Sequence, residues 1–232
     1  MVYKYLLENI KRNVREMVFG PFGHPEFIIN KEKKYAYLVN SKAACTSIKG
    51  SVIDDLGYGL KNGQNPHHFD FLNNERCFRS IDLSEYFVFT VVREPVKRIA
   101  SLYANKFRQY EVMEKQGFYY QGYMGGVFSV SDSFDRFVDC VCDISDYYAD
   151  RHFVSQSYLI SKAEKMCNTN ISVFKMEEFE FFNENIFEKV GLKISDVKLN
   201  SSKTKVNPPE VDQTSLVKLA KRYRMDFDRL GY

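Results

Sequence analysis

Two short segments of the sequence combine the residue types that bind phosphate groups in proteins. The first, residues 40–47, reads Asn-Ser-Lys-Ala-Ala-Cys-Thr-Ser and sets one lysine and several hydroxyl groups among small side chains. Small side chains let backbone N–H groups approach a ligand closely, and a helix that begins here adds the partial positive charge of its N-terminus. This chemistry indicates a cradle for an anion, in which Lys42 supplies the cation.

The cradle differs from the Walker loop that binds ATP and GTP. A Walker loop places glycines before a Lys-Ser or Lys-Thr pair. Here Lys42 comes early, Thr46 and Ser47 follow it later, and no glycine stands among residues 40–47. Ordinary ATP or GTP chemistry is therefore disfavoured.

The second segment is centred on Arg93, whose planar guanidinium can hold a phosphate through two parallel hydrogen bonds. Ser101 follows eight residues later, within a stretch that has a helical pattern. At about 100° per residue, a helix places Ser101 on a polar face and turns the neighbouring apolar residues away. The other members of this face are Lys97, Arg98, Asn105 and Arg108. We expect this face to receive an anion; a solvated polar face is the alternative.

Histidine is the natural candidate for a base near neutral pH, and the sequence contains four. His24 stands in a stretch rich in glycine and proline, away from both anion-binding segments, which leaves His67, His68 and His152. If residues 67–68 are extended, their side chains point to opposite sides, so only one of the pair would face a site. A purely structural role is the alternative for each histidine.

Strands and helices are expected to alternate around both segments. A β-prone run over 34–40 precedes the cradle, and a helical pattern extends from Thr46 to Leu56. A nearly all-apolar strand over 86–92 precedes Arg93, and a helix runs from Pro95 to about residue 108. This alternation predicts a parallel α/β sheet, whose ligands bind beyond the carboxyl ends of the strands. Both anion-binding segments would then lie at the same edge of the sheet.

Length and composition set outer bounds on the function. The chain has 232 residues, of which 44% are hydrophobic and 27% charged, so we expect a single domain over 1–232. A net charge of +3 is too small for wrapping nucleic acid, and no nucleic-acid partner is expected. The five cysteines are an odd, scattered set that argues against a disulfide framework or a structural zinc site. No metal is expected.

Residues 1–30 are expected to form an N-terminal helical extension. Leu7, Ile10, Val14 and Met17 fall on one helical face, and charged residues interrupt the apolar run that a signal peptide or membrane span needs. We expect a soluble protein without a transmembrane segment. Packing on the core is the first interpretation of this helix, and contact with an anionic membrane surface is the alternative.

Taken together, the two segments resemble the nucleotide-binding motifs of the carbohydrate sulfotransferases that use 3′-phosphoadenosine 5′-phosphosulfate (PAPS). Lys42–Lys49, Lys-Ala-Ala-Cys-Thr-Ser-Ile-Lys, is similar to their 5′-phosphosulfate loop, and Val92–Tyr103 is similar to their 3′-phosphate motif. Further resemblance lies in 151–156, 173–179 and 223–232. The likeness extends from about Lys34 to the end of the chain.

The resemblance implies a P-loop-NTPase-like, three-layer α/β/α fold with a central parallel sheet. It implies PAPS as the donor and 3′-phosphoadenosine 5′-phosphate (PAP) as the product. The donor-binding residues that it implies are Lys42, Ala43, Ala44, Cys45, Thr46, Ser47, Arg93, Ser101 and, in a late adenine-binding loop, Lys203. Lys42 would also be catalytic, because a cation must meet the charge on the departing phosphate oxygen.

The same resemblance orders the candidate bases. Residues 67–72 resemble the catalytic histidine segment of the uronyl 2-O-sulfotransferase branch, and His68 fits its spacing best. His67 comes second and His152 third.

The expected reaction is the transfer of a sulfuryl group from PAPS to a hydroxyl of a carbohydrate, in a polysaccharide, an oligosaccharide or a glycolipid. Residues 109–130, rich in glycine and aromatic side chains, are the predicted acceptor-side loop. The alternatives are a nucleotide-dependent phosphotransferase and a non-catalytic nucleotide-binding protein of the same fold. We expect a bacterial cytoplasmic enzyme of polysaccharide biosynthesis, or a Golgi lumenal one if the sequence is a trimmed piece of an anchored eukaryotic protein.

Overall fold

The computed structural model describes residues 25–59, 66, 76–77, 80–107, 123–129, 131–195 and 207–232. They divide into two compact units. The sheet unit contains the described residues of Pro25–Glu94 and Gln156–Lys205, and the helical unit those of Pro95–Ser155 and Val206–Tyr232. The expectation of one domain over 1–232 stays a prediction.

The sheet unit is built on five strands in the order β3-β1-β2-β4-β5. Their bounds are β1 Phe27–Asn30, β2 Tyr35–Leu38, β3 Arg76–Cys77, β4 Phe87–Val92 and β5 Ser172–Lys175. Strands β2, β4 and β5 are parallel, whereas β1 runs antiparallel to both β2 and β3. The predicted α/β class is confirmed, and the sheet is mixed at one edge rather than wholly parallel.

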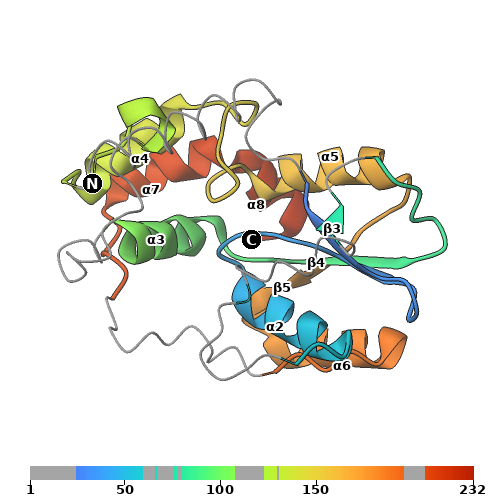
Figure 1. Cartoon of the computed structure of the whole chain (residues 1–232). Coiled ribbons are helices and arrows are strands. Elements are labelled where there is room, and N and C mark those ends of the chain that lie inside the picture. Colours follow the sequence, from blue (N-terminus) through green and yellow to red (C-terminus); the bar gives the residue numbers. More distant parts are fainter. Residues whose placement is uncertain are drawn as a thin grey trace, which may run out of the picture. The chain divides into compact units, whose positions relative to one another are not determined.

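Helices cover both faces of this sheet, which confirms the predicted three layers. Helices α2 (Cys45–Asp55) and α6 (Phe179–Val190) lie on one face, and α5 (Gln156–Cys167) lies on the other (Figure 1). The short 3-10 helix η5 (Met176–Glu178) joins β5 to α6. Tyr37, Phe89 and Val91 point toward α2 and α6 and share a buried cluster with Ile48 and Phe182. Their neighbours along each strand face the α5 side, because side chains alternate along a strand.

Strand β1 corrects the prediction of a helical extension over residues 1–30. Residues 27–30 form a strand whose side chains are buried, and residues 1–24 lie outside the described part of the chain. A tight turn over 31–34 returns the chain to β2, and the side-chain oxygen of Asn30 accepts the backbone N–H of Lys33 at 3.0 Å. A four-residue apolar run does not distinguish strand from helix until its partner is known.

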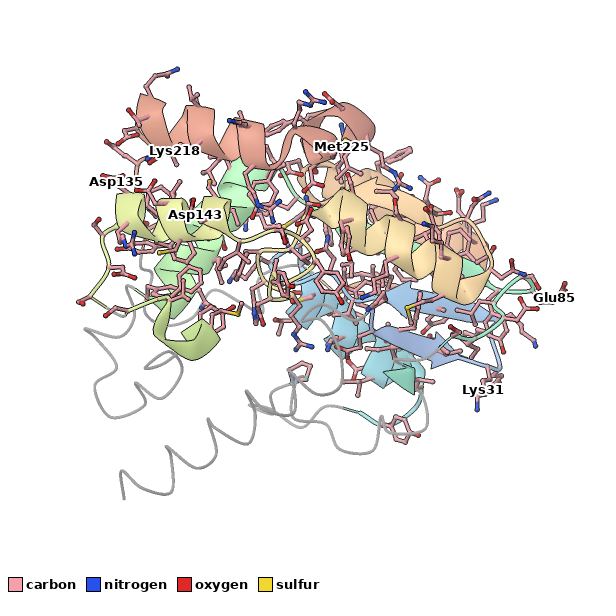
Figure 2. All side chains as sticks on the ribbon, turned by 90° about the horizontal axis from the view of Figure 1, so that it is seen from above. Lys31, Glu85, Asp135, Asp143, Lys218 and Met225 are labelled. Atoms are coloured by element: carbon pink, nitrogen blue, oxygen red, sulfur yellow. The ribbon has the colours of Figure 1, made fainter. Side chains whose placement is uncertain are left out.

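The helical unit contains α3 (Pro95–Lys106), η4 (Tyr123–Gly126), α4 (Phe134–Asp143), α7 (Gln213–Arg222) and α8 (Arg224–Leu230). Helices α4 and α7 lie side by side, with Asp135 and Asp143 on α4 and Lys218 on α7 (Figure 2). Lys218 forms an ion pair with Asp139 of α4. Ser133 caps α4 by accepting the backbone N–H of Arg136 at 3.3 Å, as the sequence before this helix suggests.

An aromatic cluster forms the core of the helical unit. Phe107, Phe128 and Phe137 contact one another, with ring centroids 4.8–6.0 Å apart. Tyr123 was expected to offer an aromatic face to a sugar within the loop 109–130, but its ring packs on Phe107 and Phe128. The rings of Tyr123 and Phe128 therefore pack on the aromatic core, whereas Val127 and Ser129 are exposed. Residues 108–122 lie outside the described residues.

No helix in the described part of the chain is long and apolar enough to cross a lipid bilayer.

Candidate functional site

The cradle predicted over residues 40–47 connects β2 to the N-terminus of α2. Lys42 has a backbone φ of 68° and Ala44 a φ of 56°, so two residues other than glycine adopt the left-handed conformation. This conformation costs on the order of 1 kcal/mol for such residues and recurs in ligand-binding loops and anion-binding nests. The strained loop thus turns the chain sharply into α2 without a glycine.

The N-terminus of α2 lacks the usual neutralising side chains. Its N-cap residue is Ala44, which makes no side-chain cap, and no acidic residue occurs in the first turn. The backbone N–H groups of a first helical turn have no partners within the helix, and together they carry a partial positive charge. An anion therefore has a favourable place at this helix end.

Ser47 supplies an independent observation at the same helix end. Its side chain is fully buried, and its hydroxyl has no hydrogen-bond partner among the described residues. A buried hydroxyl without a partner is costly, and such groups are rare in folded proteins. The chemistry of this donor set, a hydroxyl beside uncapped N–H groups with Lys42 in the same loop, fits a phosphate.

Arg93 follows directly after β4, and its side chain is half-buried. Because β2 and β4 are adjacent parallel strands, the cradle and Arg93 leave the sheet at the same edge. The Asn40 side chain links them by donating to the carbonyl oxygen of Val91 at 2.9 Å. The expectation that residues 40–47 and Arg93 lie at the same edge of the sheet is confirmed. That they bind an anion stays a prediction.

Gln156, the first residue of α5, ties the two segments together. Its side-chain oxygen accepts from Asn40 Nδ2 at 2.9 Å and from the backbone N–H of Arg93 at 3.0 Å. Its side-chain nitrogen donates to the carbonyl oxygen of Arg93 at 2.7 Å. Sequence reasoning missed this role, although residues 151–156 had been recognised as part of the resemblance.

A family model with the description "Sulfotransferase family" matches residues 25–232. The chain belongs to the sulfotransferase family. Comparisons with curated proteins and with solved structures gave no significant match. Sulfuryl transfer is the reaction of this family, so the protein is a transferase. Its sheet with helices on both faces is the P-loop-like fold of the family.

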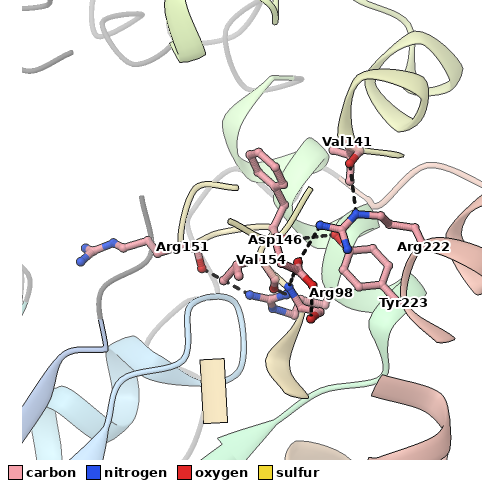
Figure 3. Close-up of polar contacts among 9 residues, drawn as sticks. Arg98, Val141, Asp146, Arg151, Val154, Arg222 and Tyr223 are labelled. Atoms are coloured by element: carbon pink, nitrogen blue, oxygen red, sulfur yellow. Dashed lines mark hydrogen bonds and ion pairs between the residues drawn. The ribbon is translucent and has the colours of Figure 1, made fainter. Parts of the chain in front are cut away.

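The sulfotransferase uses Arg98 differently from the prediction. Arg98 was placed on the anion-facing side of α3, but only 1% of it is exposed. Its guanidinium donates to the carbonyl oxygens of Val154 at 2.8 Å and Arg151 at 3.3 Å (Figure 3). Carbonyl groups in a non-helical segment lack the partners that a helix supplies, and the planar guanidinium donates to two of them at once. Arg98 is thus a structural residue of the helical unit.

Several other side chains hold the same segment of the sulfotransferase. Tyr223 donates its hydroxyl to the carbonyl oxygen of Phe153 at 2.6 Å. Asp146 accepts from Arg222 at 2.6 Å and from both the backbone N–H and the hydroxyl of Ser155, at 2.8 Å and 2.6 Å (Figure 3). Burial alone would raise the pKa of Asp146, but the hydrogen bonds from Arg222 and Ser155 and the charge of Arg222 together outweigh it and lower that pKa.

His152, the third candidate base, lies in this segment beside Asp150. Its Nδ1 contacts Oδ1 of Asp150, whose same oxygen accepts the backbone N–H of His152 at 2.9 Å. Burial would raise the pKa of Asp150, yet the charge and hydrogen bonds of His152 lower it well below its usual value. An ionised carboxylate at Nδ1 fixes the orientation of the imidazole, as a carboxylate does for many catalytic histidines.

The remaining predicted residues of the sulfotransferase are distributed as follows. Ala43 and Ala44 are buried, Lys42, Cys45 and Thr46 are half-buried, and Ser101 is half-buried on α3 in the helical unit. His67, His68 and Lys203 lie outside the described residues. Lys49, the last residue of the 5′ motif, forms a buried ion pair with Glu26 at 2.9 Å, so it anchors α2 and does not face the cradle's ligand.

Proposed function

We propose that this sulfotransferase moves the sulfuryl group of PAPS to a hydroxyl group of a carbohydrate acceptor. One observation carries the proposal most directly. The uncapped N-terminus of α2, with the partnerless buried hydroxyl of Ser47, stands at the same sheet edge as Arg93. Two anion-binding segments at one edge suit a donor that bears phosphates at both ends of its ribose.

Residues 42–47 would hold the 5′ side of the donor, with N–H groups and hydroxyls meeting the phosphate oxygens. Arg93 would hold the 3′-phosphate together with Ser101. Lys203 is the proposed contact of the adenine. PAP, which keeps both phosphates, would leave from the same residues as the product.

Transfer proceeds by in-line displacement. The acceptor oxygen forms a bond to sulfur while the bond from sulfur to the 5′-phosphate oxygen breaks, and negative charge builds on that departing oxygen. Lys42 compensates this charge. The acceptor proton passes to a histidine, and the scheme needs no metal.

His68 remains the proposed base, with His67 as its neighbour in the same segment. His152 is the third candidate, and it is supported by the contact of its Nδ1 with Asp150 in the described structure. Single substitutions His68→Ala, His67→Ala and His152→Ala separate the three. The variant that loses transfer while it keeps nucleotide affinity identifies the base.

The acceptor is proposed to be a polysaccharide, oligosaccharide or glycolipid, received in part by the loop over residues 109–130. The proposed setting is the bacterial cytoplasm, in polysaccharide biosynthesis, with the Golgi lumen as the alternative.

Two measurements test the proposed function. A ligand that binds only the folded state at about 100 times its Kd stabilises the protein by about 2.7 kcal/mol, so PAP should raise the unfolding temperature clearly more than ATP does. Transfer of labelled sulfate from PAPS to a panel of glycans then identifies the acceptor. Stabilisation by ATP alone, with phosphate transfer, would favour a phosphotransferase; stabilisation by PAP with no transfer to any acceptor would favour a non-catalytic protein.

A further inference from the structure

The side-chain amide of Gln156 lies between two loops that meet at the carboxyl edge of the sheet. Gln156 is completely buried. It accepts from Asn40 Nδ2 at 2.9 Å and from the backbone N–H of Arg93 at 3.0 Å, and it donates to the Arg93 carbonyl oxygen at 2.7 Å. Both polar groups of the Arg93 backbone therefore end on one side chain.

Neighbouring contacts complete the link between the loops. Asn40, which is also buried, donates a second bond from Nδ2 to the carbonyl oxygen of Val91 at 2.9 Å. The backbone N–H of Glu94 donates to a carboxylate oxygen of Glu177 in η5 at 3.0 Å. Side chains of α5 and η5 thus fix the segment that follows β4. The segment that follows β2 is fixed through Asn40 to the side-chain amide of Gln156.

The geometry requires an amide at this position. The backbone of Arg93 presents one N–H donor and one carbonyl acceptor beyond the end of β4, where the hydrogen bonds of the sheet no longer pair them. A glutamine amide carries both a matching acceptor and a matching donor, whereas a glutamate lacks the donor and a methionine of similar length lacks both. Gln156 and Asn40 are buried, and the two bonds between Gln156 and Arg93 are partly buried, so an unmatched substitution is costly.

We propose that Gln156 is a positioning residue that fixes the spacing between the 5′-phosphate cradle and Arg93. This role rests on the proposed function, in which these two segments hold opposite ends of the donor. When two contacts of one ligand are held at a fixed spacing, the second forms without further ordering of the protein, and the affinity gains accordingly. Without the hydrogen bonds of Gln156 this gain in affinity is lost, while each segment still binds its own phosphate.

Gln156→Met tests the role, because it keeps the length of the side chain and removes its hydrogen bonds. Affinities for PAP, adenosine 5′-phosphate and adenosine 3′-phosphate are measured by calorimetry well below the unfolding temperature. We expect the affinity for PAP to fall about tenfold or more, and the affinity for each singly phosphorylated nucleotide to fall less than about threefold. The ratio of these affinities is the readout, and a merely structural role would not move it.

Leu159→Ala is the matched control, since Leu159 is a buried residue of the same helix that makes none of these bonds. It should lower the unfolding temperature and leave the affinity ratio unchanged. If Gln156→Met does not fold, Asn40→Ala removes the β2 side of the link and should lower the ratio in the same direction.

The outcomes separate this role from the proposed function. A wild-type protein that shows no preference for PAP over ATP overturns the proposed function and this role with it. A wild-type protein that prefers PAP, with an unchanged ratio in the folded variant of Gln156 or Asn40, overturns only the positioning role. An equal fall of the ratio in Leu159→Ala also overturns it, because the effect would then follow from lost stability.

Discussion

Lys42 is the residue whose chemistry the proposed reaction uses most directly. It stands in the strained turn before α2. In the proposed reaction it would meet charge that develops only during transfer. We expect Lys42→Ala to lower kcat about 100-fold and the affinity for PAP less than about fivefold. Steady-state kinetics with PAPS and calorimetry with PAP measure the two effects. Equal losses in both would reassign Lys42 to ground-state binding.

Substitution of Arg98 should affect stability rather than catalysis, because its buried guanidinium donates to the protein's own carbonyl groups. Arg98→Met should leave the buried carbonyl oxygen of Val154 without this donor and lower the free energy of unfolding by about 1–3 kcal/mol. The affinity for PAP of the folded variant should match that of the wild type. A selective loss of PAP affinity at unchanged stability would restore Arg98 to the phosphate site.

Arg98 and Gln156 show what a sequence pattern can and cannot provide. Helical periodicity treats every arginine as polar and therefore placed Arg98 with the solvated side of α3. Its burial depends on carbonyls 53 and 56 residues away, and the contacts of Gln156 with Arg93 and Asn40 span 63 and 116 residues. No local pattern contains such partners, so both roles had to come from the structure.

At the scale of elements, apolar periodicity predicted the central strands and the helices beside the site. Strand β4 is buried over Val88–Val92, as its nearly all-apolar sequence indicates, and α2 and α3 begin within one residue of the expected positions. Strands β1 and β3 were missed because they have four and two residues and depend on pairing with each other and with β2. The mixed edge of the sheet follows from these two strands.

Gly191 tests the observed end of α6. It has a φ of 69°, and a Cβ added there would meet nothing within 4 Å. The cost of Gly191→Ala is therefore the left-handed backbone alone, about 1 kcal/mol of unfolding free energy. Gly191→Asn should cost less, because asparagine tolerates this conformation better. Equal stability of all three proteins in denaturant titrations would contradict the observed helix end.

At the scale of the whole molecule, acid should destabilise the protein through its helical unit. Asp146 and Asp150 both have folded-state pKa values below those of free aspartates. A carboxylate with a lowered pKa contributes stability that is fully present above its unfolded value, about pH 4, and that is lost as the pH falls through the folded pKa. The free energy of unfolding should therefore fall as the pH drops below about 4.

Asp146→Asn should flatten this acid dependence, measured by denaturant unfolding at a series of pH values. Asp143→Asn is the control, because Asp143 is an exposed carboxylate on α4 (Figure 2). An acid dependence that is identical in the wild type and in Asp146→Asn would show that the contacts of Asp146 with Arg222 and Ser155 do not contribute to stability.

The central claim is that the cradle at α2 and Arg93 grip one adenosine nucleotide by two separate phosphates. Its most direct test compares the affinities of wild type and Arg93→Ala for PAP and for adenosine 5′-phosphate. We expect PAP to bind the wild type much more tightly, and Arg93→Ala to lose about 10- to 100-fold in PAP affinity while adenosine 5′-phosphate binds nearly as before. An affinity for PAP that does not change in Arg93→Ala would contradict the account.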